Sequence, residues 1–178
     1  VYPNITYIFK HALTREVIYD SILTRRCKEI HKAVAEAMEQ TCQLNLEAHL
    51  STLCGHFMAG ENYEKGQIYA KLAARKAQKA GTMSEAIDQT QKRITCLGKL
   101  PLTDEDQKKM IDARTVLALY LAQINHYVEA KEAIDPIIDL AEKLGYKRRL
   151  CQIKIILGTY YAHVEENFTA AFKAFEEA

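Results

Sequence analysis

Two histidines and a cysteine stand at positions where they could ligate a metal ion. His49 and His56 are spaced to lie on roughly one face of a helix, and Cys54 lies between them. Cys42 could supply another ligand. A zinc site needs its remaining donors at similarly close spacing, and the sequence has neither a His-Glu-x-x-His motif nor a Cys-x-x-Cys pair. We therefore predict no metal ligands, and keep a small metal-dependent hydrolase as an alternative function.

His11 is the second candidate for catalysis. Ser21 or Cys27 could act as a nucleophile beside it, with Asp20 orienting the imidazole. No glycine-rich turn presents either nucleophile, and His11 stands where an extended pattern changes to a helical one. We predict that His11 is structural and that the chain has no catalytic residue. A histidine-dependent hydrolase remains part of the same alternative.

A phosphate-binding loop is the third chemical possibility. Gly55 and Gly60 have the spacing of the G-x-x-x-x-G-K-[ST] motif, but Glu61 and Asn62 follow where lysine and a hydroxyl residue are required. A glutamate there would repel phosphate. The sequence therefore predicts no nucleotide site and no cofactor.

The composition is that of a helical protein. The chain has 178 residues, 48% of them hydrophobic, with only three prolines and seven glycines. Its formal charge of +1 gives no reason to expect a nucleic-acid partner. No apolar run approaches the ~20 residues that span a bilayer, so no membrane partner is expected. Five widely spaced cysteines are typical of reduced thiols, which predicts a cytoplasmic location.

Apolar periodicity predicts about nine helices after a short extended segment at residues 2–9. Expected helix starts are Thr14, Thr24, the capping box Thr82–Glu85, and Thr103. The helices are expected at about 14–23, 24–41, 46–59, 63–80, 82–96, 103–123, 127–144, 148–162 and 168–178. Pro136 falls inside the seventh, where we expect a kink in one helix, because the apolar stripe continues through it. Asp135–Pro136 could instead begin a second helix.

The end of the chain resembles a tetratricopeptide repeat. Leu157, Gly158 and Tyr161 on one helix, followed by Ala171 and Phe175 on the next, match its pattern of small and bulky residues. Looser copies occur upstream. The resemblance implies an all-α, right-handed superhelix in which stacked helix pairs form the core and a concave surface. We divide the chain into a junction at 1–43, degenerate repeats at 44–100 and tetratricopeptide-like repeats at 101–178.

The first ~60 residues carry a second resemblance to a known group of proteins. They are similar to the segment that follows the nucleotide-binding module of large bacterial signalling ATPases, namely the class III cyclase-associated predicted ATPases and related STAND-type regulators. The matching residues are Phe9, Lys10, His11, Ala12, Leu13, Val17, Tyr19, Arg26, His31, Val34, Ala35, Ala37 and Glu39. This resemblance implies an ATP-binding parent protein, and no nucleotide site within this chain. We accordingly expect the chain to be a piece of a longer protein.

The superhelix would present a row of side chains to a partner. On the helix at 63–80 these are Lys71, Arg75 and Gln78, which could meet a partner's carboxylates in a basic groove. The corresponding residues of later helices are Asp112, Thr115 and Gln152. They do not rebuild the basic carboxylate clamp of chaperone-binding tetratricopeptide domains.

The sequence therefore favours a non-catalytic scaffold that binds a protein partner or another domain of its parent chain. The hydrolase is one alternative. The other is a DNA-binding regulator that uses the basic residues of the helix at 24–41, which are Arg25, Arg26, Lys28 and Lys32.

Overall fold

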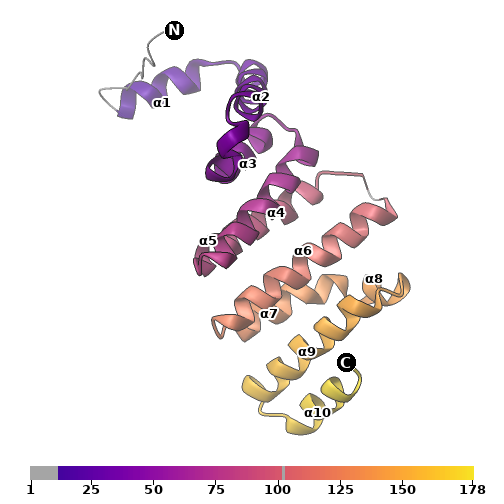
Figure 1. Cartoon of the computed structure of the whole chain (residues 1–178). Helices are drawn as coiled ribbons and strands as arrows, with labels where there is room; N and C mark the ends of the chain where they lie inside the picture. Colours follow the sequence, from indigo (N-terminus) through magenta and orange to yellow (C-terminus); the bar gives the residue numbers. More distant parts are fainter. Residues whose placement is uncertain (1–11, 102) are drawn as a thin grey trace.

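A computed structural model describes residues 12–101 and 103–178. The expected extended segment at residues 2–9, and His11, lie outside these residues. The described chain is all-α, and its helices pack in sequence, each mainly on its neighbours (Figure 1). The α-helices are α1 (Ala12–Ser21), α2 (Thr24–Thr41), α3 (Leu50–Ala59), α4 (Tyr63–Lys79), α5 (Met83–Leu97), α6 (Asp104–Gln123), α7 (Tyr127–Ile134), α8 (Ile138–Lys143), α9 (Lys147–His163) and α10 (Phe168–Glu176).

Pro136 interrupts one of these helices without reversing the chain. It lies in a 3-10 turn, Asp135–Ile137, between α7 and α8, and the backbone on both sides keeps right-handed helical angles. Proline lacks the N–H that an α-helical hydrogen bond requires, which accounts for the tighter turn. Counting α7 and α8 as one interrupted helix, the described residues form nine helices, as predicted.

The helix starts agree with the sequence pattern in some places only. The Thr103 hydroxyl accepts a hydrogen bond from the Asp106 backbone N–H, so this predicted cap is confirmed. Thr24 is not a cap, because α2 already includes it and Leu23 occupies the cap position. At Thr82 the single hydroxyl hydrogen can be donated to the Ala77 carbonyl at 3.1 Å or to the Glu85 carboxylate at 3.3 Å, and among the described residues the hydroxyl accepts no backbone hydrogen bond. The Thr82 backbone N–H donates to the Ala77 carbonyl and not to Glu85, so the predicted capping box was wrong in both halves.

The first part of the core lies between α2, α3 and α4. Phe57 is fully buried, and its ring stacks on Tyr69 with the ring centroids 5.4 Å apart. Gly60 allows the backbones of α2 and α3 to approach closely, since a Cβ there would lie 3.0 Å from the Lys32 nitrogen. The same cluster includes Ala35, Leu50, Leu53, Cys54, Ala70 and Ala73. Residues 43–49, expected partly as α-helix, form a 3-10 segment before α3.

Small residues bring the next helices close together. Ala77 of α4 and Ala86 of α5 pack with Tyr120 of α6 in one buried cluster. The alanine stripe predicted on α4 is buried at Ala70, Ala73, Ala74 and Ala77, whereas Ala80 is exposed. A larger cluster around Ile111, Ile134, Ile137 and Ile153 joins α6 to α7 and α9. The apolar core therefore continues from α5 to α6 and on to α9.

A partly buried polar contact joins α2 to α4. The Glu39 carboxylate accepts hydrogen bonds from Lys65 Nζ and the Tyr69 hydroxyl. Burial alone would raise the pKa of Glu39, but these two donors outweigh it and hold the pKa below its usual value. Glu39 therefore stabilises the folded chain in its ionised form.

Acidification should remove this contribution. The stabilisation from a carboxylate with a lowered pKa is complete above its unfolded-state pKa of about 4.3, and it is lost as the pH falls through the lower folded-state value. We expect Glu39→Gln to flatten the dependence of the free energy of unfolding on pH below that value, as measured by urea denaturation. The control, Glu64→Gln on the exposed side of α4, should keep the wild-type slope. Equal slopes in all three proteins would contradict this assignment.

No helix within the described ranges is both long and apolar enough to cross a membrane.

A candidate anion-binding cavity

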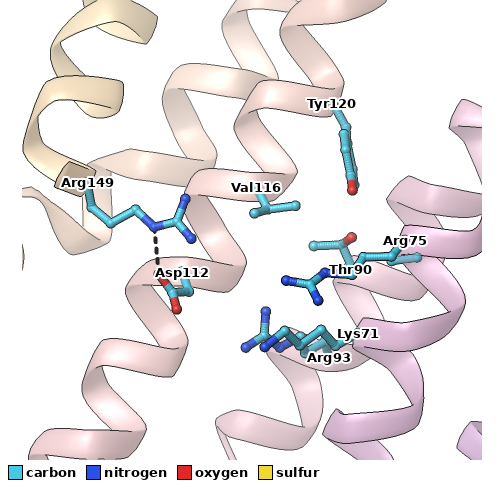
Figure 2. Close-up of a pocket in the computed structure, with 9 residues that line it drawn as sticks. Lys71, Arg75, Thr90, Arg93, Asp112, Val116, Tyr120 and Arg149 are labelled. Atoms are coloured by element: carbon cyan, nitrogen blue, oxygen red, sulfur yellow. Dashed lines mark hydrogen bonds and ion pairs between the residues drawn. The ribbon is translucent and has the colours of Figure 1, made fainter. Parts of the chain in front are cut away.

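A cavity of about 90 Å³ lies where α4, α5, α6 and α9 meet. Its walls carry two residues of the predicted basic groove, Lys71 and Arg75, and also Asp112 from α6. The remaining lining residues are Ala74, Thr90, Arg93, Val116, Tyr120 and Arg149. Figure 2 shows the basic side chains of α4 and α5 extending from one side toward Asp112 and Arg149 on the other. The space suits several water molecules or one small oxyanion.

Positive charge dominates the cavity. Lys71, Arg75, Arg93 and Arg149 supply four cations, and Asp112 is the one carboxylate in the lining, which leaves a net charge of +3. Arg149 Nε donates to Asp112 Oδ1 at 2.6 Å, and the Tyr146 hydroxyl donates to the same oxygen at 3.1 Å. Asp112 is thus already used to hold the start of α9 against α6. Within the part of the chain that the structure describes, Lys71, Arg75 and Arg93 form no ion pair of this kind.

Arg93 is the most unusual of these cations. Its residue surface is 5% exposed, and its Nε atom is buried without a hydrogen-bond partner among the described residues. Burial is the main cause that lowers the pKa of Arg93; Arg75 and Arg149 lower it further, and Asp112 opposes them. A guanidinium remains protonated in proteins even so. A buried N–H donor without a partner is costly, so this side chain would gain from an anion that accepts a hydrogen bond from it.

Two neighbouring side chains complete the donor set. Burial, then repulsion from Arg93 and Arg75, lowers the pKa of Lys71. Burial also raises the pKa of Tyr120, which keeps its hydroxyl protonated as a donor. Figure 2 shows that hydroxyl pointing into the space beside Arg75. The cavity therefore offers N–H and O–H donors with little competing acceptor.

The other residues predicted on the concave face do not line the cavity. Thr115 is fully buried and donates to the Ile111 carbonyl, so it is not available to a partner. Gln78 is exposed and does not line the cavity. Gln152 lies at its edge, where its side-chain oxygen accepts from Arg149 Nη1 at 2.7 Å. Lys71, Arg75 and Asp112 are thus the predicted residues that the fold brings together.

Arg93 and Arg149 were missed by the sequence reasoning. Arg93 continues the stripe of Ala86, Thr90 and Leu97 on α5, all of them buried. A lone cation on an otherwise buried stripe was the available signal. Arg149 belongs to the basic run 147–149, whose pattern is typical of a solvated face or of ion pairs, and it pairs with Asp112.

The candidate metal ligands do not come together. Cys54 is buried in the α2–α4 core, and burial raises its pKa to about 11, which disfavours the thiolate that binds metals. His56 Nδ1 lies 2.8 Å from His31 Nδ1 instead. Within 12–101 and 103–178, no group of three or more His, Cys, Asp or Glu side chains could hold a metal ion.

The basic residues of α2 are largely engaged at the surface. Arg25 and Arg26 both pair with Glu29, and Lys28 pairs with Glu61 at 2.7 Å. This reduces the positive charge that α2 could present to DNA phosphates.

Comparison with known proteins finds no relative of this chain. No protein-family model, no curated protein and no solved structure matches this chain. The geometry of the cavity is therefore the strongest functional observation on this chain. The donors that line the cavity suit the binding of an anion.

Proposed function

We propose that this chain is a non-catalytic interaction scaffold whose cationic cavity binds an acidic segment of a protein. The observation that carries the proposal is the imbalance of charge: four cations surround a cavity with one carboxylate in its lining. Charge-assisted hydrogen bonds from arginine to carboxylates are among the strongest polar contacts in protein recognition. The bound segment belongs either to a separate protein or to another domain of the parent chain.

The proposed architecture is a right-handed superhelix of the tetratricopeptide type. Its support is the order of packing, in which α6 contacts α9 as well as the intervening α7. In such an array the first helix of each pair lines the concave side. Lys71, Asp112 and Arg149 come from α4, α6 and α9, which would be the first helices of three pairs.

The proposed setting is a larger cytoplasmic signalling ATPase. Its support is the resemblance carried by residues 9–39. On this proposal the scaffold binds its acidic partner and thereby biases the nucleotide state of a module elsewhere in the parent protein, as a coupling between two sites requires. The chain itself performs no reaction.

Binding of a defined acidic peptide tests the proposal. A short fluorescein-labelled peptide of alternating glutamate and serine should raise its anisotropy on titration with the chain at physiological ionic strength. The double variant Lys71→Glu, Arg75→Glu should weaken this binding by at least about tenfold, because it replaces attraction by repulsion inside the cavity.

The matched control is Lys79→Glu, an exposed charge reversal at the end of the same helix and outside the cavity. It should change the affinity by no more than about twofold, since exposed charges are screened. Absence of binding to the peptide, or equal loss in Lys79→Glu and the double variant, would refute the proposal. Tighter binding to duplex DNA than to the peptide would favour the DNA-binding alternative.

A further inference from the structure

We infer that the cavity around Arg93 recognises a phosphoryl group rather than a simple carboxylate. The inference rests on the proposed function and deepens it, because it names the chemistry of the bound anion. The shared chemistry is a phosphomonoester or phosphate dianion. Its source is either a phosphorylated side chain of the partner protein or a free small molecule.

The net charge of the cavity is the first argument for a phosphoryl group. A carboxylate would bring one negative charge to a cavity with a net charge of +3, and a phosphomonoester brings nearly two at neutral pH. The dianion therefore neutralises more of the repulsion among the cations. Asp112 attracts Arg93 and Lys71 as well as Arg149, but it is one negative charge against four positive ones.

The geometry of the donors is the second step. Lys71 and Arg75 approach from α4, Arg93 from α5 and Arg149 from α9, so donors surround the space from more than one side (Figure 2). A planar carboxylate presents two oxygens in one plane. A tetrahedral phosphate presents three in different directions, which suits donors that converge from several helices.

The burial of Arg93 is the third argument, and this observation alone points to a bound ligand. Its side chain is 95% buried, and its Nε lacks a partner within the described part of the chain. The guanidinium lines a partly open space of about 90 Å³, which can hold one oxyanion and is too small for a peptide chain. The bound segment would therefore lie outside and insert one group.

Three peptides of one sequence test the inference against the full chain. They differ at one position, which is phosphoserine, glutamate or serine, and inorganic phosphate is a fourth probe. By isothermal titration calorimetry we expect one phosphoserine peptide per chain, bound at least about tenfold more tightly than the glutamate peptide, in line with the extra charge-assisted contacts. Binding of inorganic phosphate as tight as that of the phosphopeptide identifies a free anion as the source. Much weaker binding identifies a phosphorylated protein.

The Arg93→Met variant links binding to the cavity. It removes the buried cation and keeps a side chain of similar length, and we expect it to weaken phosphopeptide binding by at least about tenfold. Arg148→Met, the control, removes an exposed arginine outside the cavity and should leave the affinity within about twofold. If Arg93→Met does not fold by circular dichroism, Lys71→Met takes its place with the same expectation.

Two outcomes overturn the inference. One is equal affinity for the phosphoserine and glutamate peptides, which would leave the proposed acidic-peptide scaffold standing without phosphate selectivity. The other is unchanged phosphopeptide binding in the cavity variant. Failure of every peptide to bind, while inorganic phosphate binds, would refute the proposed function alone; failure of the peptides and of inorganic phosphate would refute both.

Discussion

Asp112→Asn is expected to lower the free energy of unfolding by about 2–3 kcal/mol, which is a large share of a typical domain's stability. The carboxylate side chain is 26% exposed, and it accepts hydrogen bonds from Arg149 and Tyr146. Asparagine keeps the shape but removes the charge, so four cations would face one another without a carboxylate in the lining. The contact between α6 and the start of α9 would weaken at the same time. Urea denaturation at neutral pH measures the loss.

Asp88→Asn is the matched control. Asp88 pairs with Lys92 one turn away, and its side chain is 53% exposed, so we expect a loss of no more than about 0.5 kcal/mol. A second readout separates electrostatics from packing: Asp112→Asn should bind anionic peptides more tightly than the wild-type chain does, because the competing carboxylate is gone. Lower stability with unchanged or weaker anion binding would contradict the role given to Asp112.

Phe57→Ala is expected to cost about 3–5 kcal/mol, the usual range for removing a fully buried aromatic side chain. Phe57 has no exposed surface, stacks on Tyr69 and has Lys65 Nζ 5.0 Å from its ring centroid. Its removal leaves a void between α2, α3 and α4 that alanine cannot fill. Chemical denaturation followed by circular dichroism should show a lower midpoint.

Phe172→Ala serves as its control, since Phe172 lies on α10 with 68% of its surface exposed. This variant should change the free energy of unfolding by no more than about 0.5 kcal/mol. Similar losses in the two variants would mean that the α2–α4 core does not carry the stability assigned to it.

The sequence pattern predicted the helices well where local signals were strong. Thr103 and Asp106 form the expected cap, and the alanines of α4 are buried at helical spacing. It failed where tertiary packing chose among similar local states. Residues 43–49 adopt a 3-10 conformation, and Leu23 rather than Thr24 precedes α2. Helix ends often differ by a residue or two for this reason.

The sequence predicted some of the residues that line the cavity and not others. Lys71 and Arg75 share a helix face, so their proximity followed from periodicity alone. Arg149 comes from α9, far along the chain, and its contact with Asp112 depends on how α6 and α9 pack. The burial of Arg93 likewise depends on α4 and α6 packing against α5, and its place on the buried stripe of α5 was the one local signal.

The most direct test of the central claim is a crystal structure of the full chain soaked with tungstate, a heavy tetrahedral oxyanion that replaces phosphate. We predict an anomalous peak inside the cavity, within hydrogen-bonding distance of Arg93 and Lys71, that disappears in crystals of Arg93→Met. Absence of a peak in the wild-type cavity, or a peak only at exposed lysines elsewhere, would contradict the account.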